Sequence, residues 1–263
     1  METWSRTITS ADGTPLACQW RGEGPPVVLV SGPLSTGAAE APLAGLLAPY
    51  FRTYTYDRRG RGGSGRGAGR YAVEREMADL AAVVAEAGEG AGVFGMSSGG
   101  ALALKAAAAG VPIPRLALYE PPYRTDPADR KAYAERTARL ERLVADGRFG
   151  DALALFLADT PPAELAGLRA SPLWSSLEAV AHTLPHDHAV LGDGLVPAEG
   201  LAAVSARVLV LDGGASPSWL RETARAVARA VPRGRHGTLT GQTRAVAPHV
   251  LAPVLRDFLS ATD

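Results

Sequence analysis

Apolar and polar positions divide the chain into three stretches with different periodicities. In residues 1–125, short strand-like runs are followed by segments with apolar residues at helical spacing. Residues 126–199 show the helical spacing alone, and in residues 200–263 the two patterns alternate again. Alternation of strand and helix predicts a parallel sheet covered by helices. We therefore expect an α/β core domain formed by 1–125 and 200–263, with 126–199 inserted as a helical cap.

The expected strands begin with an antiparallel hairpin. Two segments of alternating polar and apolar or β-branched residues, Trp4–Thr9 and Leu16–Trp20, flank the turn Asp12-Gly13. Val27–Val30 is a continuous apolar run, which is typical of a strand buried on both faces. The further strands are expected at Arg52–Tyr56, Ala91–Phe94, Leu116–Tyr119, Val208–Leu211 and His236–Leu239. The sheet should thus be mostly parallel.

Helical spacing predicts five helices in the core and four in the cap. Those of the core are Ala41–Tyr50, Ala72–Glu86, Ala101–Ala109, Ser218–Ala230 and Pro248–Ala261, and those of the cap are Asp129–Asp146, Phe149–Ala158, Ala163–Ala170 and Pro172–Leu184. Parallel strands with helical crossovers bring their loops together at the carboxyl ends of the strands, so we expect the site at that edge.

The segment Gly95–Gly100, with the sequence Gly-Met-Ser-Ser-Gly-Gly, joins an expected strand to an expected helix. Small residues around Ser97 permit the sharp, strained turn that such a junction needs. In the pattern Gly-x-Ser-x-Gly the turn lifts the serine hydroxyl above the sheet edge and directs the N–H of Ser98 toward the same point. A glycine-rich turn without chemistry is the alternative, but the strand before and the helix after favour a nucleophile elbow.

With this elbow, the chain resembles the α/β-hydrolase family over nearly its whole length. Tyr56–Ser64 is similar to the family's Asp-x-Arg-Gly-x-Gly-x-Ser segment after its fourth strand, with a shift of one residue. Val27–Val30 and the following Ser31-Gly32-Pro33 resemble its third strand and oxyanion loop. The resemblance implies the α/β-hydrolase fold, with a mostly parallel central sheet and an inserted helical cap.

The place that the resemblance gives to the catalytic histidine holds an arginine. A serine nucleophile needs a base to take its proton and a third group to orient that base. The family supplies the base after its last strand, where this chain has Gly241–Arg244. A guanidinium stays protonated at physiological pH, so Arg244 is unable to act as the base. We expect it to offer a fixed cation to an enolate, phenolate or carboxylate, with a surface ion pair as the alternative.

The oxyanion loop departs from the family as well. In the resemblance, the residue after a His-Gly pair donates its backbone N–H to the developing oxyanion. Here the pair is Ser31-Gly32 and the next residue, Pro33, has no N–H. Loss of one such donor typically slows the reaction about 10²–10³-fold. The oxyanion hole then keeps only the amide of Ser98, unless the loop shifts so that Leu34 donates as well or the alignment is off by one residue. We expect substrate contacts from the five residues Ser31, Gly32, Pro33, Leu34 and Ser98.

The acid of the family has two candidate places in this chain. One follows the seventh strand, where Asp212 ends the strand and Ser216 holds the usual position. The other follows the sixth strand, where this chain has Glu120. Without a histidine to orient, either carboxylate could accept structural hydrogen bonds or pair with Arg244. We expect Glu120 to face the site as a catalytic residue, together with Ser97 and Arg244.

Five histidines remain as candidate bases. His236 is expected near the start of the last strand, away from the site, and His249 in the closing helix. His182, His186 and His188 lie close together in the cap, with a proline among them. Their spacing also suggests metal ligands, but ordinary polar cap residues are the preferred interpretation. His182, on an expected helix, is the one that we expect to contact substrate.

The bulk composition narrows the function classes. A net charge of +0 gives no reason to expect nucleic acid or an anionic membrane, and no apolar run reaches the length of a membrane span. The single cysteine, Cys18, excludes an internal disulfide, and the first residues lack the pattern of a signal peptide. No cofactor motif or compact metal-ligand set is present. We expect a cytoplasmic monomer or homodimer that binds a small-molecule substrate without cofactor or metal.

Three functions fit these observations. The preferred one is a non-hydrolytic reaction on a small, largely apolar molecule, such as C–C bond formation or cleavage, cyclisation or elimination in natural-product biosynthesis. A serine esterase that uses a non-standard base is favoured by Ser97 and opposed by Arg244 and Pro33. A catalytically inactive ligand-binding protein is the third. The fold alone does not decide among them.

Overall fold

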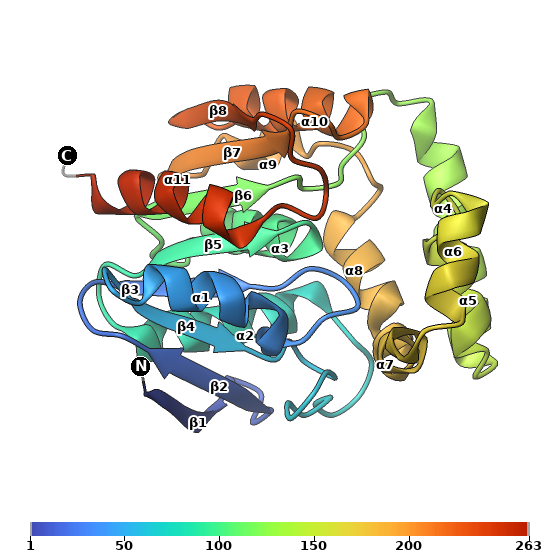
Figure 1. Cartoon of the computed structure of the whole chain (residues 1–263), viewed down its shortest axis with the longest axis horizontal. Coiled ribbons are helices and arrows are strands. Elements are labelled where there is room, and N and C mark those ends of the chain that lie inside the picture. The colour runs from blue at the N-terminus through green and yellow to red at the C-terminus, as the bar shows by residue number, and fades with distance from the viewer. Residues whose placement is uncertain (1, 262–263) are drawn as a thin grey trace.

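The computed structural model describes residues 2–261, whose strands form one eight-stranded sheet in the order β1-β2-β4-β3-β5-β6-β7-β8 (Figure 1). β1 and β2 are antiparallel, β2 is antiparallel to β4, and the other neighbours are parallel. The strands are β1 (Thr3–Thr9), β2 (Pro15–Arg21), β3 (Pro26–Val30), β4 (Arg52–Tyr56), β5 (Gly92–Met96), β6 (Arg115–Tyr119), β7 (Arg207–Gly213) and β8 (Gly234–Leu239). This is the mostly parallel sheet with an N-terminal hairpin that the sequence predicts.

Helices cover both faces of the sheet because its central strands are apolar on both sides. In β3, Val28 and Val30 belong to the core under α2, α3 and α10, whereas Val27 and Leu29 belong to the core under α1 and α11. Figure 1 shows α1 and α11 on the near side of the sheet. These helices are α1 (Ala41–Leu47), α2 (Val73–Ala87), α3 (Ser98–Ala108), α10 (Ser218–Ala230) and α11 (Pro248–Ser260), with the short η1 (Gly37–Glu40) leading into α1.

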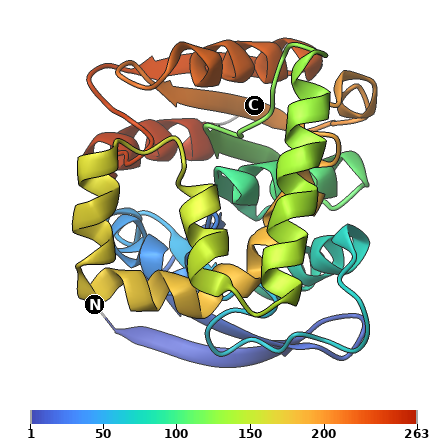
Figure 2. The same cartoon turned by 90° about the vertical axis from the view of Figure 1, so that its right-hand side faces the viewer.

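Between β6 and β7 the chain is helical and lies over the carboxyl edge of the sheet, as Figures 1 and 2 show. Its elements are α4 (Asp129–Ala145), α5 (Phe149–Phe156), α6 (Pro162–Arg169), α7 (Pro172–Val180), η2 (Ala181–Thr183), α8 (Leu184–Leu191) and α9 (Ala198–Leu201). We use the word cap for residues 126–199, whose status as a separate unit stays a prediction. α8 packs against both α3 and α4 and so connects the cap to the core.

One expected helix is divided in the structure. The pattern predicts a helix over Pro172–Leu184, but the chain forms α7, one turn of 3₁₀ helix and then α8. Pro185 lies in the first turn of α8, where the missing N–H of proline leaves no hydrogen bond unmade. The proline therefore begins a new helix, and His186 and His188 are helical. Among the helices of residues 2–261, none is both long and apolar enough to cross a membrane.

Candidate active site

Ser97 stands at the junction of β5 and α3 with φ 52° and ψ −122°, a strained conformation for a residue with a side chain. Its N–H donates to the carbonyl of Tyr119 on the neighbouring strand at 2.8 Å. A Cβ on Gly95 would lie 2.4 Å from Cα of Gly100, and one on Gly99 would lie 2.4 Å from the carbonyl oxygen of Ser31. The glycines of the motif thus allow the close approach that holds Ser97 in this turn.

Ser97 lies where two cavities meet at the carboxyl edge of the sheet. The larger has a volume of about 340 Å³ and a mostly apolar wall that includes Leu43, Met96 and Leu251. The smaller, of about 100 Å³, extends under the cap. The residues that line both are Pro33, Ser97, Phe156 and Arg244. The two cavities therefore share a corner at Ser97. We call them together the cleft, and the larger of them the main cavity.

Arg244 brings a cation to this corner. Its loop is fixed by the Tyr119 hydroxyl, which donates to the carbonyl of Thr243 at 2.7 Å, and by the N–H of Ala215, which donates to the carbonyl of Gln242 at 2.9 Å. The side chain itself is exposed, and within residues 2–261 it has no hydrogen bond or ion pair. The expected alternative of a surface ion pair is therefore not found in that part of the chain.

The Ser97 hydroxyl has no imidazole partner in the described residues. His182 bonds through its ring nitrogens to the carbonyls of Gly60 and Ala179, and does not line either cavity. His186 stacks on a tyrosine, His236 bonds to Asp212, and His249 lies on α11 facing a separate surface hollow. The expected contact of His182 with substrate stays a prediction, but the structure does not bring this ring to the cleft.

His188 is the histidine that lines the cleft, in the smaller cavity. Its Nδ1 is 2.8 Å from the Thr137 hydroxyl, and its ring stacks on Tyr133 with the centroids 5.1 Å apart. Burial lowers the pKa of this imidazole to about 4, so the ring is neutral at neutral pH. In the described chain no hydrogen bond reaches its Nε2, which leaves a neutral nitrogen on the same cleft as Ser97.

Glu120 follows β6 and lies in the wall of the main cavity. Its backbone is also strained, with φ 47°. Oε1 accepts the N–H of Gly213 at 2.8 Å, while Oε2 is buried without a partner. Asp212 lies within β7, is fully buried and pairs with His236, away from both cavities. Of the two candidate carboxylates, the structure therefore brings only Glu120 to the cleft.

Glu40, at the end of η1, is a carboxylate in the main cavity that the sequence interpretation missed. Its side chain is buried, and within residues 2–261 it has neither a hydrogen bond nor an ion pair. Loss of water on burial raises the pKa of Glu40 to about 7. No motif marks this residue; only the fold shows that the turn before α1 faces Ser97.

The loop after β3 is expected to contact substrate through four residues, and the structure brings two of them, Gly32 and Pro33, to the cleft. Gly32 and Pro33 line the main cavity, and a Cβ on Gly32 would lie 3.3 Å from Cβ of Ser97, so glycine permits the contact between loop and elbow. Ser31 is fully buried beneath it. Leu34, with φ 56°, packs against the cap and does not line the cleft. The alternative in which the N–H of Leu34 replaces the missing donor of Pro33 therefore stays untested.

Beneath the elbow, a buried ionic cluster joins the core to the cap. Asp187 of α8 accepts hydrogen bonds from the Ser98 hydroxyl at 2.6 Å, from Arg58 at 2.8 Å and from Arg61 at 2.7 Å. Arg58 also donates to Glu76 of α2 at 2.7 Å. Burial alone would raise the pKa of Asp187, but the two guanidinium groups outweigh it and hold that pKa at about 2. The hydroxyl of Ser98 is thus occupied within this cluster, although Ser98 also lines the smaller cavity.

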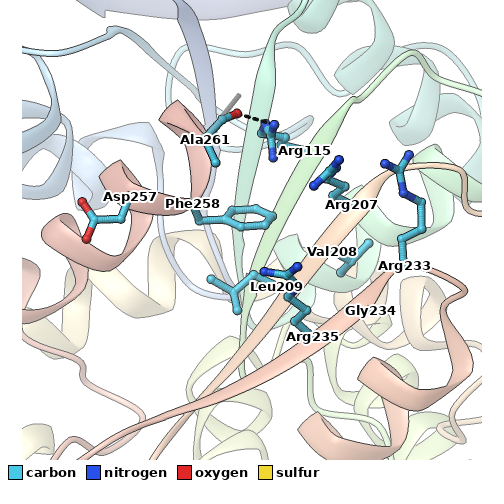
Figure 3. Close-up of a pocket in the computed structure, with 10 residues that line it drawn as sticks. All are labelled: Arg115, Arg207, Val208, Leu209, Arg233, Gly234, Arg235, Asp257, Phe258 and Ala261. Atoms are coloured by element: carbon cyan, nitrogen blue, oxygen red, sulfur yellow. Dashed lines mark hydrogen bonds between the residues drawn. The ribbon is translucent and has the colours of Figure 1, made fainter. Parts of the chain in front are cut away.

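A larger hollow, of about 560 Å³, lies at the opposite, amino edge of the sheet (Figure 3). Four arginines line it, and one of them, Arg115, donates to the carbonyl of Ala261. This hollow contains no serine, cysteine or histidine that could act as nucleophile or base. Its greater volume therefore does not make it the better candidate for an active site. Within residues 2–261, no group of three or more His, Cys, Asp or Glu is arranged to hold a metal ion.

Comparisons with known proteins agree with the fold. The model of a family described as the alpha/beta hydrolase family matches residues 27–254. The crystal structure of an alpha/beta hydrolase from Sphaerobacter thermophilus DSM 20745 is 51% identical over 97% of this chain and 100% of that chain, with a TM-score of 0.88. A search of curated proteins found no significant match.

Two more distant structures show the fold alone. An esterase from Exiguobacterium antarcticum is 19% identical over 98% of this chain and 100% of that chain, with a TM-score of 0.78. A bromoperoxidase from Bacillus anthracis is 17% identical over 98% and 100%, with a TM-score of 0.73. Proteins with differently named activities thus share this architecture, so the chemistry has to be argued from the residues of the cleft.

Proposed function

This chain belongs to the alpha/beta hydrolase family, and from that premise we propose that it is an enzyme that converts a small, largely apolar molecule without hydrolysing it. The observation that carries the proposal is the side chain of Arg244. It is a cation without a hydrogen bond or ion pair in residues 2–261, it lines both cavities with Ser97, and it holds the place where the family resemblance expects a basic histidine. The mostly apolar wall of the main cavity supports the substrate class.

The residues of the cleft suit a reaction in which negative charge develops on a substrate oxygen. Arg244 would stabilise that oxygen as a fixed cation, and the Ser97 hydroxyl and the Ser98 N–H would donate hydrogen bonds to it. Because no imidazole is hydrogen-bonded to the Ser97 hydroxyl in the described residues, Ser97 would act as a donor and not as a nucleophile. C–C bond formation or cleavage, cyclisation and elimination develop such enolate-like charge when they occur next to a carbonyl group, and we propose a reaction of this class in natural-product biosynthesis.

A second candidate is ester hydrolysis with an unusual base, and one observation favours it. His188 lines the smaller cavity together with Ser97, is neutral, and has a free Nε2 in the described chain. A rotation of either side chain that brings Nε2 within hydrogen-bond distance of Oγ would supply the missing base. In this reading Arg244 would bind a charged group of the ester.

Ester turnover and serine labelling separate these candidates. We expect 4-nitrophenyl butyrate to be hydrolysed hardly faster than in buffer, and a fluorophosphonate probe to label Ser97 poorly. Arg244→His should increase labelling, because it places a base after β8; a positioned base is typically worth about 10²–10⁴-fold. Pro33→Ala adds a possible oxyanion donor, worth about 10²–10³-fold. Arg225→His, on the exposed face of α10, is the matched control and should change neither readout.

Rapid ester hydrolysis by the unmodified protein, abolished by Ser97→Ala, would contradict the non-hydrolytic proposal. Loss of that hydrolysis in His188→Ala would then identify the histidine as the base. If neither ester hydrolysis nor conversion of any apolar carbonyl compound is detected while such compounds bind, the chain is a ligand-binding protein and the enzyme proposal fails.

A further inference from the structure

The carboxyl group of Glu40 lies in the main cavity and has no role in the proposed function. The side chain is 6% exposed and lies in the same wall as Ser97, Glu120 and Arg244. Its two carboxylate oxygens have no hydrogen-bond partner in the described chain. Both keep some solvent-accessible surface, whereas Oε2 of Glu120 has almost none. Glu40 therefore presents an unpartnered carboxyl group to whatever enters the cavity.

Few charged groups face Glu40 from the elements around it. η1 packs against α1, β3 and β4. α1 and β3 contain no charged residue, and Arg52 of β4 donates instead to the carbonyl of Ala87. Asp57, just after β4, is occupied with the N–H of Gly37 at 2.8 Å. Across the cavity stand only Glu120, as a like charge, and Arg244, which is more than 4.0 Å from any carboxylate oxygen in the described chain.

We propose that the main cavity binds a small apolar anion, whose charged oxygen is held by Arg244, together with a proton that is held on the Glu40 carboxyl group. This inference rests on the anion-binding role that the proposed function gives to Arg244. It names the ligand class as an apolar body that carries one carboxylate, enolate or phenolate oxygen.

Proton binding to Glu40 and anion binding are coupled because each changes the charge of the same poorly solvated cavity. Burial already raises the pKa of Glu40 to about 7, so near neutral pH about half of the molecules hold the proton. An anion that enters the cavity adds a like charge, which raises that pKa further. A protonated carboxyl group also donates a hydrogen bond to the bound anion, whereas an ionised one only accepts. Ligand and proton therefore bind together.

Calorimetry with simple probes tests the coupling. The probes are benzoate, octanoate and 4-phenylbutyrate, which stay ionised above about pH 5.5. Titration in two buffers with different ionisation enthalpies reports the protons taken up. We expect uptake near zero at about pH 5.5, about half a proton at pH 7 and close to one at pH 8.5, with affinity falling about tenfold per pH unit above 7. The pKa of His188 is about 4, so this neighbour stays neutral throughout.

Two substitutions, each with a matched control, test whether Glu40 holds the proton and Arg244 holds the anion. Glu40→Gln keeps a hydrogen-bond donor but has no proton to gain, so uptake should vanish and affinity should stay at its low-pH value at every pH. Arg244→Gln should weaken binding at least about tenfold at every pH. The controls are Glu222→Gln and Arg225→Gln, which make the same charge changes on the exposed face of α10 and should alter nothing. Arg244 is exposed, so its variant tests the proposal even if Glu40→Gln misfolds.

Three results would overturn the inference: no binding of any of the three carboxylates at millimolar concentration, proton uptake that persists in Glu40→Gln, or tighter binding of 4-phenylbutylamine than of 4-phenylbutyrate. The last would mean that the cavity is an ammonium site formed by Glu40 and Glu120. Ester hydrolysis through Ser97 would defeat the proposed function alone, because the binding measurement can be made with the Ser97→Ala variant.

Discussion

At the scale of single residues, a carboxyl group that loses water without gaining a partner keeps its proton to higher pH, and Glu40 is in this position. Its pKa is about 7 in the folded chain against 4.5 for an unperturbed glutamate. The folded state therefore binds more protons than the unfolded state between these values. Stability falls as pH rises through that window and stays at the lower level above pH 7. The contribution of Glu40 thus makes the free energy of unfolding lower at neutral than at mildly acidic pH.

Glu40→Gln should remove this loss. We expect the variant to be more stable than the parent by roughly 2–3 kcal/mol at pH 8, where the buried carboxyl group of the parent is ionised. At pH 4.5 the difference should be close to nothing, because Glu40 is then protonated in the folded chain and as neutral as glutamine. Urea unfolding at the two pH values measures the difference, with Glu222→Gln on the surface as the control. An equal effect at both pH values would show that packing, and not ionisation, is responsible.

At the scale of elements, α8 is tied to the elbow by the carboxylate of Asp187. Its pKa of about 2 lies below the unperturbed 3.8, so the stabilisation is complete above pH 3.8 and is lost as pH falls toward 2. Asp187→Asn keeps the shape but leaves the guanidinium groups of Arg58 and Arg61 without their shared partner. Breaking one side of a buried ion pair typically costs about 3–5 kcal/mol.

We therefore expect Asp187→Asn to lower the free energy of unfolding by about 3–5 kcal/mol at pH 7, as read from urea unfolding. Asp193→Asn is the matched control. It breaks the exposed pair of Asp193 with Arg130, at 2.9 Å, and should cost about 1 kcal/mol or less. Equal effects of the two substitutions would mean that the buried cluster contributes no more than a surface pair.

The sequence predicts most elements well, because strand-like and helical periodicities alternate clearly along the chain. The fold class, the elbow at Ser97 and the exposed loop with Arg244 follow from local patterns that the structure keeps. α8 was missed because Pro185 indicates a break as readily as a beginning. Glu40 and His188 could not be assigned to the cleft, since their positions depend on how η1 and α8 pack and not on any neighbouring residue. Contacts between distant segments leave no periodic signal.

At the scale of the whole molecule, the cleft lies between a tightly packed core and a cap in which two helices, α6 and α7, are little buried. Nine of the eleven residues of α3 are buried, whereas no residue of α6 or α7 is. Helices with little burial open at lower free energy than the core. Figure 2 shows α6 (yellow) and α7 (gold) at the left and lower border of the cap.

Hydrogen exchange should report this division. We expect amides in α6 and α7 to exchange at least about 10²-fold faster than those in α3, because local opening of the cap does not require the core to unfold. Mass spectrometry of peptic peptides from the intact chain measures the rates. Similar protection in the three helices would show that cap and core open as one unit.

Three residues at the carboxyl edge, Leu34, Ser97 and Glu120, are the non-glycine residues with left-handed φ in the described chain. Each such conformation costs about 1–3 kcal/mol, which is a large part of the roughly 5–15 kcal/mol that keeps a domain folded. Glycine would relax all three. At Leu34 and Glu120 glycine would also lose the packing against the cap and the hydrogen bond to Gly213. A screen for heat resistance that scores melting temperature alone would therefore favour Ser97→Gly, which removes the strain together with the hydroxyl that the proposed function needs. Thermostability engineering of this chain has to hold these three residues constant.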